Sequence, residues 1–180
     1  MPLQVVLKII TAGDGGVGKT TLLHRYVGGV FLESTQMTLG VEFLVKELEI
    51  QHHVNGENQA AVLQLWDFGG QAQFRHLLGK YAIGAKGAVL MFDLTRLITL
   101  DKIDQWVQIC RKYDKNLPII FLGSKSDLDE DIRIEDGLAE EIREKYGLLK
   151  YLKVSSKTGE NVNRAFELLV QEILERKGYL

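Results

Sequence analysis

The sequence has little cysteine and little proline, and it has no long hydrophobic run. Its 180 residues include a single cysteine, Cys110, which excludes an internal disulfide framework and a cysteine-rich zinc site. No apolar segment approaches the roughly 18 residues that a membrane-spanning helix needs. The 22 basic and 24 acidic residues nearly balance, which gives no overall signature of a nucleic-acid-binding protein. These absences favour a soluble, cytoplasmic protein with no nucleic-acid partner.

Both ends of the chain lack a lipidation signal. Pro2 stands where N-myristoylation requires glycine, and the last four residues, from Lys177 to Leu180, contain no cysteine that could be prenylated. The first residues also lack the charged and apolar regions of a signal peptide. We therefore expect no lipid anchor and, because the length suits one core, a single domain over residues 1–180.

Short apolar runs alternate with amphipathic stretches along the chain. Val5–Ile10, Ala88–Phe92 and Ile119–Leu122 are typical of strands that are covered on both faces. Residues 103–110 and 162–173 place apolar side chains at helical spacing, with polar residues on the opposite side. This alternation predicts an α/β protein with a doubly wound, mostly parallel sheet.

One segment departs from this alternation and predicts an antiparallel hairpin. Two strand-like runs, Val41–Ile50 and Ala60–Asp67, flank Asn55-Gly56, a pair that tolerates the positive φ angles of a tight turn. The apolar phase slips between Val45 and Leu48, so we expect a bulge or irregular pairing there.

The clearest motif is the glycine-rich run from Gly13 to Thr20, which fits G-x-x-x-x-G-K-[ST]. It follows the first expected strand and precedes an expected helix, which is the context that the motif requires. Its glycines let backbone amides point at phosphate oxygens. Lys19 adds a point charge near the β- and γ-phosphates, and Thr20 offers a hydroxyl to Mg²⁺. The motif predicts a nucleoside triphosphate but does not separate kinases, ATPases and GTPases.

Four further motifs follow at a spacing that resembles the Ras superfamily of small GTPases, most closely its Rab branch. Thr38-Leu39-Gly40-Val41-Glu42-Phe43 is similar to the switch I pattern T-I-G-V-[DE]-F. Trp66-Asp67-Phe68-Gly69-Gly70-Gln71 resembles D-x-x-G-Q, although Phe68-Gly69 replaces the Thr-Ala of the Ras and Rab pattern. Ser124-Lys125-Ser126-Asp127 stands where the family has N-K-x-D. Residues 154–161 resemble T-S-A-K-T-G-E-N, and Asn161 at their end is expected to cap the last helix.

The resemblance implies a P-loop NTPase fold, with a six-stranded, mostly parallel sheet, one antiparallel edge strand and about five helices on both faces. It implies GTP or GDP as the bound nucleotide and Mg²⁺ as the cofactor. The metal would be held by Thr20 and Thr38 and, through water, by Asp67. Nucleotide contacts would come from Asp14, Gly15, Gly16, Val17, Gly18, Lys19, Thr20, Thr21, Phe31, Thr38, Gly70, Ser124, Lys125, Asp127, Ser155, Ser156 and Lys157.

Guanine selection has a chemical basis in these residues. The carboxylate of Asp127 can accept hydrogen bonds from N1–H and the 2-amino group of guanine, neither of which adenine offers. By resemblance, the Ser156 amide would meet guanine O6, and Phe31, Lys125 and Lys157 would flank the ring.

The implied reaction is slow hydrolysis of GTP, with Gln71 orienting the attacking water and with Lys19 and Gly70 stabilising charge. No Arg or Lys lies between Val27 and Val45, so switch I carries no arginine finger, and we do not expect Arg75 to act as one. Activating and exchange proteins are therefore expected partners of a monomeric switch. A nucleotide-loaded scaffold with negligible turnover stays open as an alternative, because of Phe68-Gly69 and Ser124; a P-loop kinase is a weaker one.

Effectors would bind the switch segments, residues 31–45 and 67–81. Phe43, Trp66 and Tyr81 match an aromatic triad through which Rab-like switches meet effectors, and aromatic side chains beside a mobile loop make good anchors. A purely structural role for the three rings in the core stays open at this point.

Overall fold

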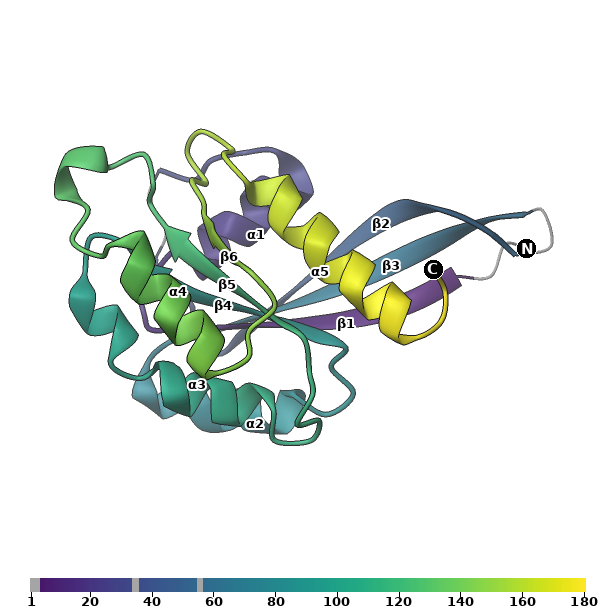
Figure 1. The fold of residues 1–180 in the computed structure, drawn as a ribbon, viewed down its shortest axis with the longest axis horizontal. Coiled ribbons are helices and arrows are strands. Elements are labelled where there is room, and N and C mark those ends of the chain that lie inside the picture. The colour runs from purple at the N-terminus through teal and green to yellow at the C-terminus, as the bar shows by residue number, and fades with distance from the viewer. Residues whose placement is uncertain (1–3, 34–35, 55–56) are drawn as a thin grey trace.

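The computed structural model describes residues 4–33, 36–54 and 57–180 (Figure 1). Their strands form one six-stranded sheet in the order β2-β3-β1-β4-β5-β6. Only β2 and β3 pair antiparallel, and each of the other pairings is parallel. The predicted α/β fold with one antiparallel edge strand is confirmed. The strands are β1 (Gln4–Ala12), β2 (Val41–Val54), β3 (Glu57–Phe68), β4 (Gly87–Asp93), β5 (Ile119–Ser124) and β6 (Tyr151–Lys153).

Five α-helices in the described part of the chain cover the two faces of this sheet, as expected. Helices α1 and α5 lie on one face, and α2, α3 and α4 lie on the other (Figure 1). None of the described helices is long and apolar enough to cross a membrane. The helices are α1 (Lys19–Gly28), α2 (Arg75–Tyr81), α3 (Ile103–Cys110), α4 (Asp136–Lys145) and α5 (Val162–Arg176).

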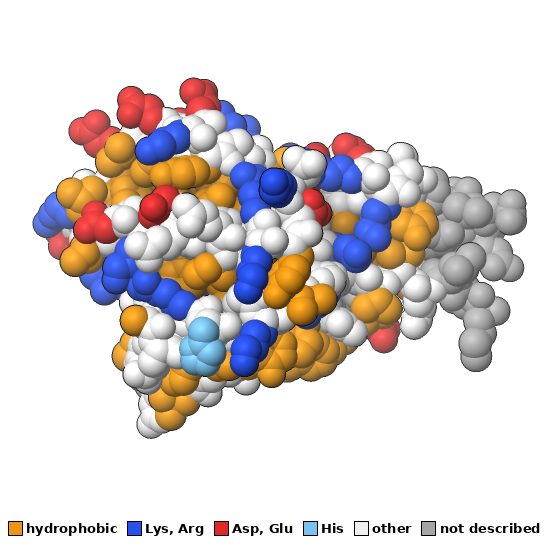
Figure 2. Space-filling model, turned by 90° about the horizontal axis from the view of Figure 1, so that it is seen from below, with side chains coloured by type: hydrophobic (Ala, Val, Ile, Leu, Met, Phe, Trp, Pro, Cys, Tyr) orange, Lys and Arg blue, Asp and Glu red, His pale blue; other side chains and the backbone are white. Residues whose placement is uncertain are grey.

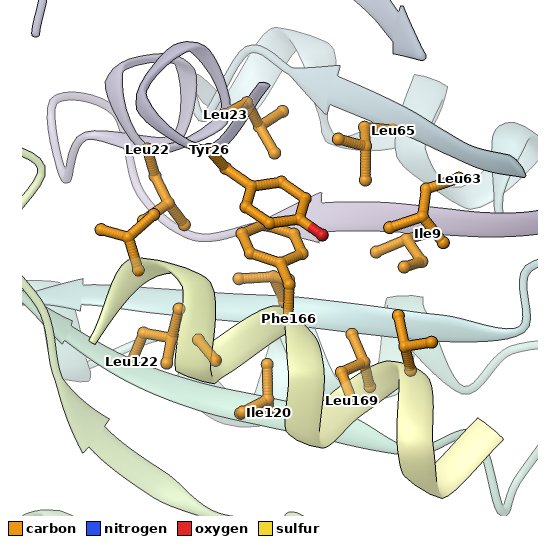
Figure 3. Close-up of a cluster of buried hydrophobic side chains, with 14 of the residues drawn as sticks. Ile9, Leu22, Leu23, Tyr26, Leu63, Leu65, Ile120, Leu122, Phe166 and Leu169 are labelled. Atoms are coloured by element: carbon orange, nitrogen blue, oxygen red, sulfur yellow. The ribbon is translucent and has the colours of Figure 1, made fainter. Parts of the chain in front are cut away.

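The face under α1 and α5 is closed by an aromatic stack. The rings of Tyr26 and Phe166 lie 3.8 Å apart at 8° between planes, with Leu22, Leu23 and Leu169 around them (Figure 3). Each such side chain contributes about 1.5–3 kcal/mol by its burial.

All seven residues of β4 are buried, which explains why its sequence is apolar without alternation. The site is thus built on rigid elements.

The helical faces predicted from apolar spacing are confirmed. Ile103, Trp106 and Cys110 of α3 are all buried on the second face of the sheet. Burial raises the pKa of the Cys110 thiol to about 12, so this cysteine is an inert core residue. Helix α5 ends at Arg176, and Gly178 takes a φ of +72°, as expected of a glycine that follows a helix.

Figure 2 shows the α2 and α3 face with basic and hydrophobic side chains interleaved, and with acidic side chains mostly toward the upper left.

The predicted bulge between Val45 and Leu48 is wrong. Pairing of β2 with β3 runs without interruption from Val41 to Ile50, and the register shift lies between Ile50 and His53. The predicted turn at Asn55-Gly56 lies outside the described residues.

Lys46 explains the misleading phase of this strand. Side chains alternate normally along it: Phe43 and Val45 face solvent, while Leu44 packs on the core under α1 and α5. Lys46 lies on the same inward face as Leu44. Its Nζ donates to the Tyr26 carbonyl oxygen at 2.6 Å and lies 4.1 Å from the centroid of the Tyr26 ring. A lysine at an inward position, held by a cation–π contact, looked like a register slip in the sequence.

Candidate functional site

The glycine-rich run forms a loop between β1 and α1. A Cβ on Gly13 would lie 2.4 Å from the Met91 carbonyl oxygen of the neighbouring strand β4, so no other residue fits there. Gly16 has a φ of +76°, which side chains rarely tolerate. These two constraints fix a loop whose backbone, with the N-terminus of α1, can bind an anion.

Lys19 lies buried inside this loop. Its Nζ donates to the carbonyl oxygens of Gly13 at 2.7 Å and Asp14 at 3.0 Å. Burial lowers the pKa of Lys19 to about 8, although the charges of Asp67 and Asp14 act in the opposite direction. A buried ammonium held by two neutral carbonyls gains stability from an anion, and this favours a phosphate at the loop.

Three side-chain oxygens from separate segments converge beside Lys19. Thr20 Oγ1 lies 2.6 Å from Thr38 Oγ1 and donates to Asp67 Oδ2, which lies 3.4 Å from Thr38 Oγ1. Burial raises the pKa of Asp67, and the hydrogen bond from Thr20 and the charge of Lys19 only partly offset this. A hard divalent cation would stabilise this crowded carboxylate, and hydroxyl and carboxylate oxygens are the ligands that Mg²⁺ prefers.

Sequence reasoning missed Thr11, which supports the same carboxylate. Its Oγ1 lies 3.2 Å from Asp67 Oδ1 and 3.1 Å from the Trp66 carbonyl oxygen, within donating distance of either, at a fully buried position on β1. A polar residue inside the apolar run of β1 was the available signal. Among the described residues, no group of three or more His, Cys, Asp or Glu side chains forms a separate metal cluster.

The Phe68-Gly69 departure has a steric explanation. Phe68 is buried in the core, 5.7 Å from Tyr81 between ring centroids. A Cβ on Gly69 would stand 2.5 Å from the Thr38 carbonyl oxygen and 2.7 Å from the Phe74 ring. Gly70 is equally constrained, because its Cβ would lie 2.4 Å from the Gly15 amide nitrogen. Both glycines therefore let the segment after β3 approach the phosphate loop and the Thr38 segment.

Gln71 lies beside the phosphate loop in contact with Met37. Its Nε2 donates to Met37 Sδ at 3.2 Å, and its Oε1 accepts from Gln73 at 2.9 Å. Met37 is 52 % exposed, and its methyl group lies 2.8 Å from the point where a Cβ on Gly15 would stand. A neutral amide is thus held near the phosphate loop by weak contacts only.

Arg75 lies between α3 and the phosphate loop. Its Nη1 donates to Gln105 Oε1 at 3.0 Å, its Nη2 lies 3.9 Å from Asp14 Oδ1, and its guanidinium lies 5.0 Å from the centroid of the Trp106 ring. That Arg75 does not act as an arginine finger stays a prediction.

A second, wider pocket of about 500 Å³ adjoins the phosphate loop. Its volume suits a purine and its ribose. The predicted base-binding residues line it together: Phe31, Ser124, Lys125, Asp127, Ser156 and Lys157, with Gly16, Val17, Gly18 and Thr21 on the side of the loop. The predicted phosphate residues Gly15, Lys19, Thr20, Thr38 and Gly70 line the neighbouring cavity of about 70 Å³.

Two predicted contact residues, Asp14 and Ser155, line neither cavity. Asp14 Oδ1 accepts a hydrogen bond from Trp106 Nε1 at 2.9 Å, which ties the phosphate loop to α3. Buried Ser155 donates to Asp127 Oδ1 at 2.7 Å and so orients that carboxylate. Both side chains therefore position parts of the site and do not line the cavities themselves.

Ser124, in place of asparagine, still ties β5 to the phosphate loop. Its buried Oγ lies 2.6 Å from the Val17 carbonyl oxygen and 2.9 Å from that of Phe92, within donating distance of either. Ser124, one of the two departures that left a scaffold role open, therefore still connects β5 to the phosphate loop.

Sequence reasoning also missed Asp93. It ends the apolar strand β4, is completely buried, and its Oδ2 lies 2.7 Å from Lys125 Nζ. Lys125 itself has a φ of +65°, rare for a side-chain-bearing residue, so its backbone is held at a special conformation. A carboxylate at the end of an apolar run, the same pattern that marks Asp67, was the signal.

The three aromatic residues of the predicted effector surface lie together. Ring centroids of Phe43 and Trp66 are 4.9 Å apart, and those of Trp66 and Tyr81 are 5.2 Å apart. Phe43 is 46 % and Tyr81 38 % exposed, while Trp66 is partly buried between them. Trp66 Nε1 has no hydrogen-bond partner among the described residues. The cluster is thus a half-exposed surface rather than core.

The expected cap on the last helix is wrong in one respect. Asn161 occupies the N-cap position of α5, but its side chain makes no capping hydrogen bond. Its φ of +56° directs Nδ2 to the Lys153 carbonyl at 2.8 Å, so the residue fastens β6 instead.

Comparison with known proteins agrees with this geometry. The profile described as the Ras family matches residues 8–175. Ras-related protein Rab-19 from Xenopus laevis is 36 % identical over 179 residues, which are 99 % of this chain and 81 % of the relative. Ras-related protein RABA4a from Arabidopsis thaliana is 37 % identical, over 95 % of this chain and 73 % of its own length. Ras-related protein Rab-27B from Homo sapiens is 34 % identical, over 95 % and 81 %.

Proposed function

The chain belongs to the Ras family of small GTPases, and from that premise we propose which of its residues bind GTP and hydrolyse it. It is a Rab-like GTP-binding switch, and we propose that residues 1–180 form a single G domain. The observation that carries the assignment is that the phosphate loop, the threonine–aspartate cluster and the base pocket adjoin at the carboxyl ends of the parallel strands, where ligands bind in such sheets.

The nucleotide binds across both cavities. The backbone amides of the phosphate loop and the Lys19 ammonium hold the phosphates, and the pocket around Asp127 takes the base. Asp127, oriented by Ser155, accepts two hydrogen bonds from guanine, and adenine offers neither of these donors, which selects GTP over ATP. Phe31 and the stems of Lys125 and Lys157 line the walls on which the ring lies.

Thr20, Thr38 and Asp67 would hold Mg²⁺, the carboxylate acting through water. When bound, the ion neutralises charge on the β- and γ-phosphate oxygens. Thr38 belongs to a segment with exposed neighbours, and Thr20 belongs to α1. A γ-phosphate with Mg²⁺ between them would hold that segment, and loss of the γ-phosphate would release it. This is the physical basis of switching.

Hydrolysis forms a bond between a water oxygen and the γ-phosphorus and breaks the bond to the β-phosphate oxygen, leaving GDP and phosphate. Gln71 orients the water, and Lys19 and the Gly70 amide stabilise charge on the phosphoryl oxygens. No described cationic side chain besides buried Lys19 lies among the residues of the γ-phosphate cavity, so intrinsic turnover is slow, on the order of 10⁻⁴ s⁻¹.

Partner proteins complete the cycle. An activating protein that supplies an arginine would add about 10³–10⁵ to the rate. Effectors dock on Phe43, Trp66 and Tyr81, whose half-exposed rings adjoin both switch segments.

Single-turnover hydrolysis of bound GTP tests this function. The wild type should release phosphate slowly, and Gln71→Leu should slow release about tenfold or more while GDP binding stays the same. Equal rates in the two proteins, even with an added arginine-donating activator, would support the scaffold alternative instead.

A further inference from the structure

Arg96 reaches the phosphate loop from the turn after β4. Its Nη2 donates to the Gly15 carbonyl oxygen at 3.0 Å, and its Nε donates to Asp93 Oδ2 at 3.1 Å. A Cβ on Gly16 would lie 3.4 Å from the same Nη2, so the guanidinium is packed on the loop's outer side. Two donors of one rigid fork thus bridge the loop and the end of β4.

The bond to the Gly15 carbonyl also fixes an amide. The peptide between Gly15 and Gly16 is planar and trans, because the described chain has no cis peptide bond. Its C=O and N–H therefore point in opposite directions. While Arg96 holds the carbonyl outward, the Gly16 N–H faces the opposite side, where Gly16 lines both cavities. A cation on the carbonyl also polarises the amide and makes its N–H a stronger donor.

Asp93 connects this contact to the base pocket. Besides Arg96, the buried carboxylate accepts from the Thr95 amide at 2.9 Å and hydroxyl at 2.7 Å, and it pairs with Lys125 at 2.7 Å. Burial alone would raise its pKa, but the bonds from Lys125 and Thr95 outweigh this and hold the pKa of Asp93 below its usual range. The charged group therefore stands between a phosphate-loop peptide and a wall of the base pocket.

We propose that Arg96 is a positioning residue that holds the Gly15–Gly16 peptide with its N–H toward the phosphates. The Asp93 carboxylate, which pairs with both Arg96 and Lys125, holds the Arg96 guanidinium in place. The inference rests on the proposed function, since it assigns a role to the site that binds the nucleotide. Arg96 touches neither reacting atom; it slows nucleotide release by preorganising one donor of the phosphate loop.

The test uses Arg96→Ala, Arg96→Gln and Arg96→Lys, with Arg164→Ala as the matched loss of one exposed arginine on α5. Release of a fluorescent GDP analogue should be about tenfold faster in the alanine and glutamine variants, as expected for one charge-assisted hydrogen bond. Lysine should restore only part of the effect, because one ammonium cannot span both acceptors. Arg164→Ala should match the wild type.

Phosphorus NMR of bound GDP gives a second readout. The β-phosphorus resonance should move in Arg96→Gln, with unchanged melting temperature, because one donor to the phosphates has changed. Release within twofold of the wild type with an unmoved resonance would overturn the inference and leave the proposed function standing. Equal acceleration by Arg164→Ala would also overturn it, by showing a general charge effect. A wild type that does not retain GDP would contradict the proposed function itself.

Discussion

The base pocket and the γ-phosphate side of the site are built differently. In the base pocket, the polar side chains hold one another: Ser155 binds Asp127, Lys125 pairs with buried Asp93, and Ser124 ties the strand to the phosphate loop. On the γ-phosphate side, the Gln71 side chain hydrogen-bonds to Met37 and Gln73, and Thr38 lies in a segment with exposed Met37 and Leu39. One side is preorganised and roomy, and the other is small and weakly fastened.

This difference assigns separate tasks to the two sides. A preorganised pocket loses little freedom on binding, so it can supply affinity and base selection in both nucleotide states. A weakly fastened segment has a low cost of moving, so a single phosphate can decide its conformation. Substitutions in the first should therefore change binding, and substitutions in the second should change turnover and partner recognition.

The largest effect is expected at Asp127. Asp127→Asn should weaken GDP binding by about 10²–10⁴, because two hydrogen bonds to a charged acceptor are lost. Binding of xanthosine diphosphate should improve, since its ring offers an acceptor where guanine has a donor. Competitive displacement measures both, with Asp129→Asn on the same loop as the control. An unchanged affinity of Asp127→Asn for GDP would show that the base pocket does not select the base through Asp127.

Lys19 should make the stability of the ligand-free protein depend on pH. Its pKa is about 8 when folded and 10.5 when unfolded, so between these values the unfolded chain binds more protons. Stability contributed by this site therefore rises with pH from about 8 to 10.5, by at most about 3 kcal/mol. Chemical denaturation of the wild type and of Lys19→Met should diverge in that window. Parallel curves would contradict the burial argument.

Gly69 brings the segment after β3 into close contact with the Thr38 segment on the γ-phosphate side. Gly69→Ala places a Cβ 2.5 Å from the Thr38 carbonyl oxygen, so we expect a loss of about 2 kcal/mol and a melting temperature lower by roughly 6 °C. Gly79→Ala is the matched control, because the nearest atom to its Cβ would be Lys112 Nζ at 3.9 Å. A melting temperature no lower for Gly69→Ala than for Gly79→Ala would show that the close approach does not constrain the fold.

Met37 should give the smallest effect. Met37→Ala frees Gln71 from the thioether and opens space beside Gly15, so intrinsic hydrolysis should rise by about twofold to threefold, as expected for a weak contact. Met37→Leu keeps the bulk and removes the sulfur acceptor, so its hydrolysis rate should lie between those of the wild type and Met37→Ala. Single-turnover rates check this order, and a slower Met37→Ala would mean that the contact assists catalysis.

Much of the fold and of the site was predictable because it depends on local chemistry. The strand Ala88–Phe92 was recognisable from apolar residues alone, and the phosphate loop from glycines and Lys19 at fixed spacing. Which residues of β2 face inward was not predictable, because Lys46 faces inward through a contact with Tyr26, twenty residues away in sequence.

What could not be predicted depends on tertiary contacts. Asp14 belongs to the phosphate-loop motif, yet its carboxylate serves Trp106, 92 positions later. Arg96 carries no motif, and only the folded chain brings it to Gly15, 81 positions earlier. Residues that position others leave no spacing signal of their own, whereas residues that bind a common ligand do.

Equilibrium binding of Mg²⁺-GDP and Mg²⁺-ADP by the purified chain tests the central claim most directly. The account predicts micromolar or tighter binding of GDP and at least one-hundredfold weaker binding of ADP, because adenine lacks the two donors that the partly buried Asp127 carboxylate would accept from guanine. Equal affinity for the two nucleotides, or no binding of either, would contradict it.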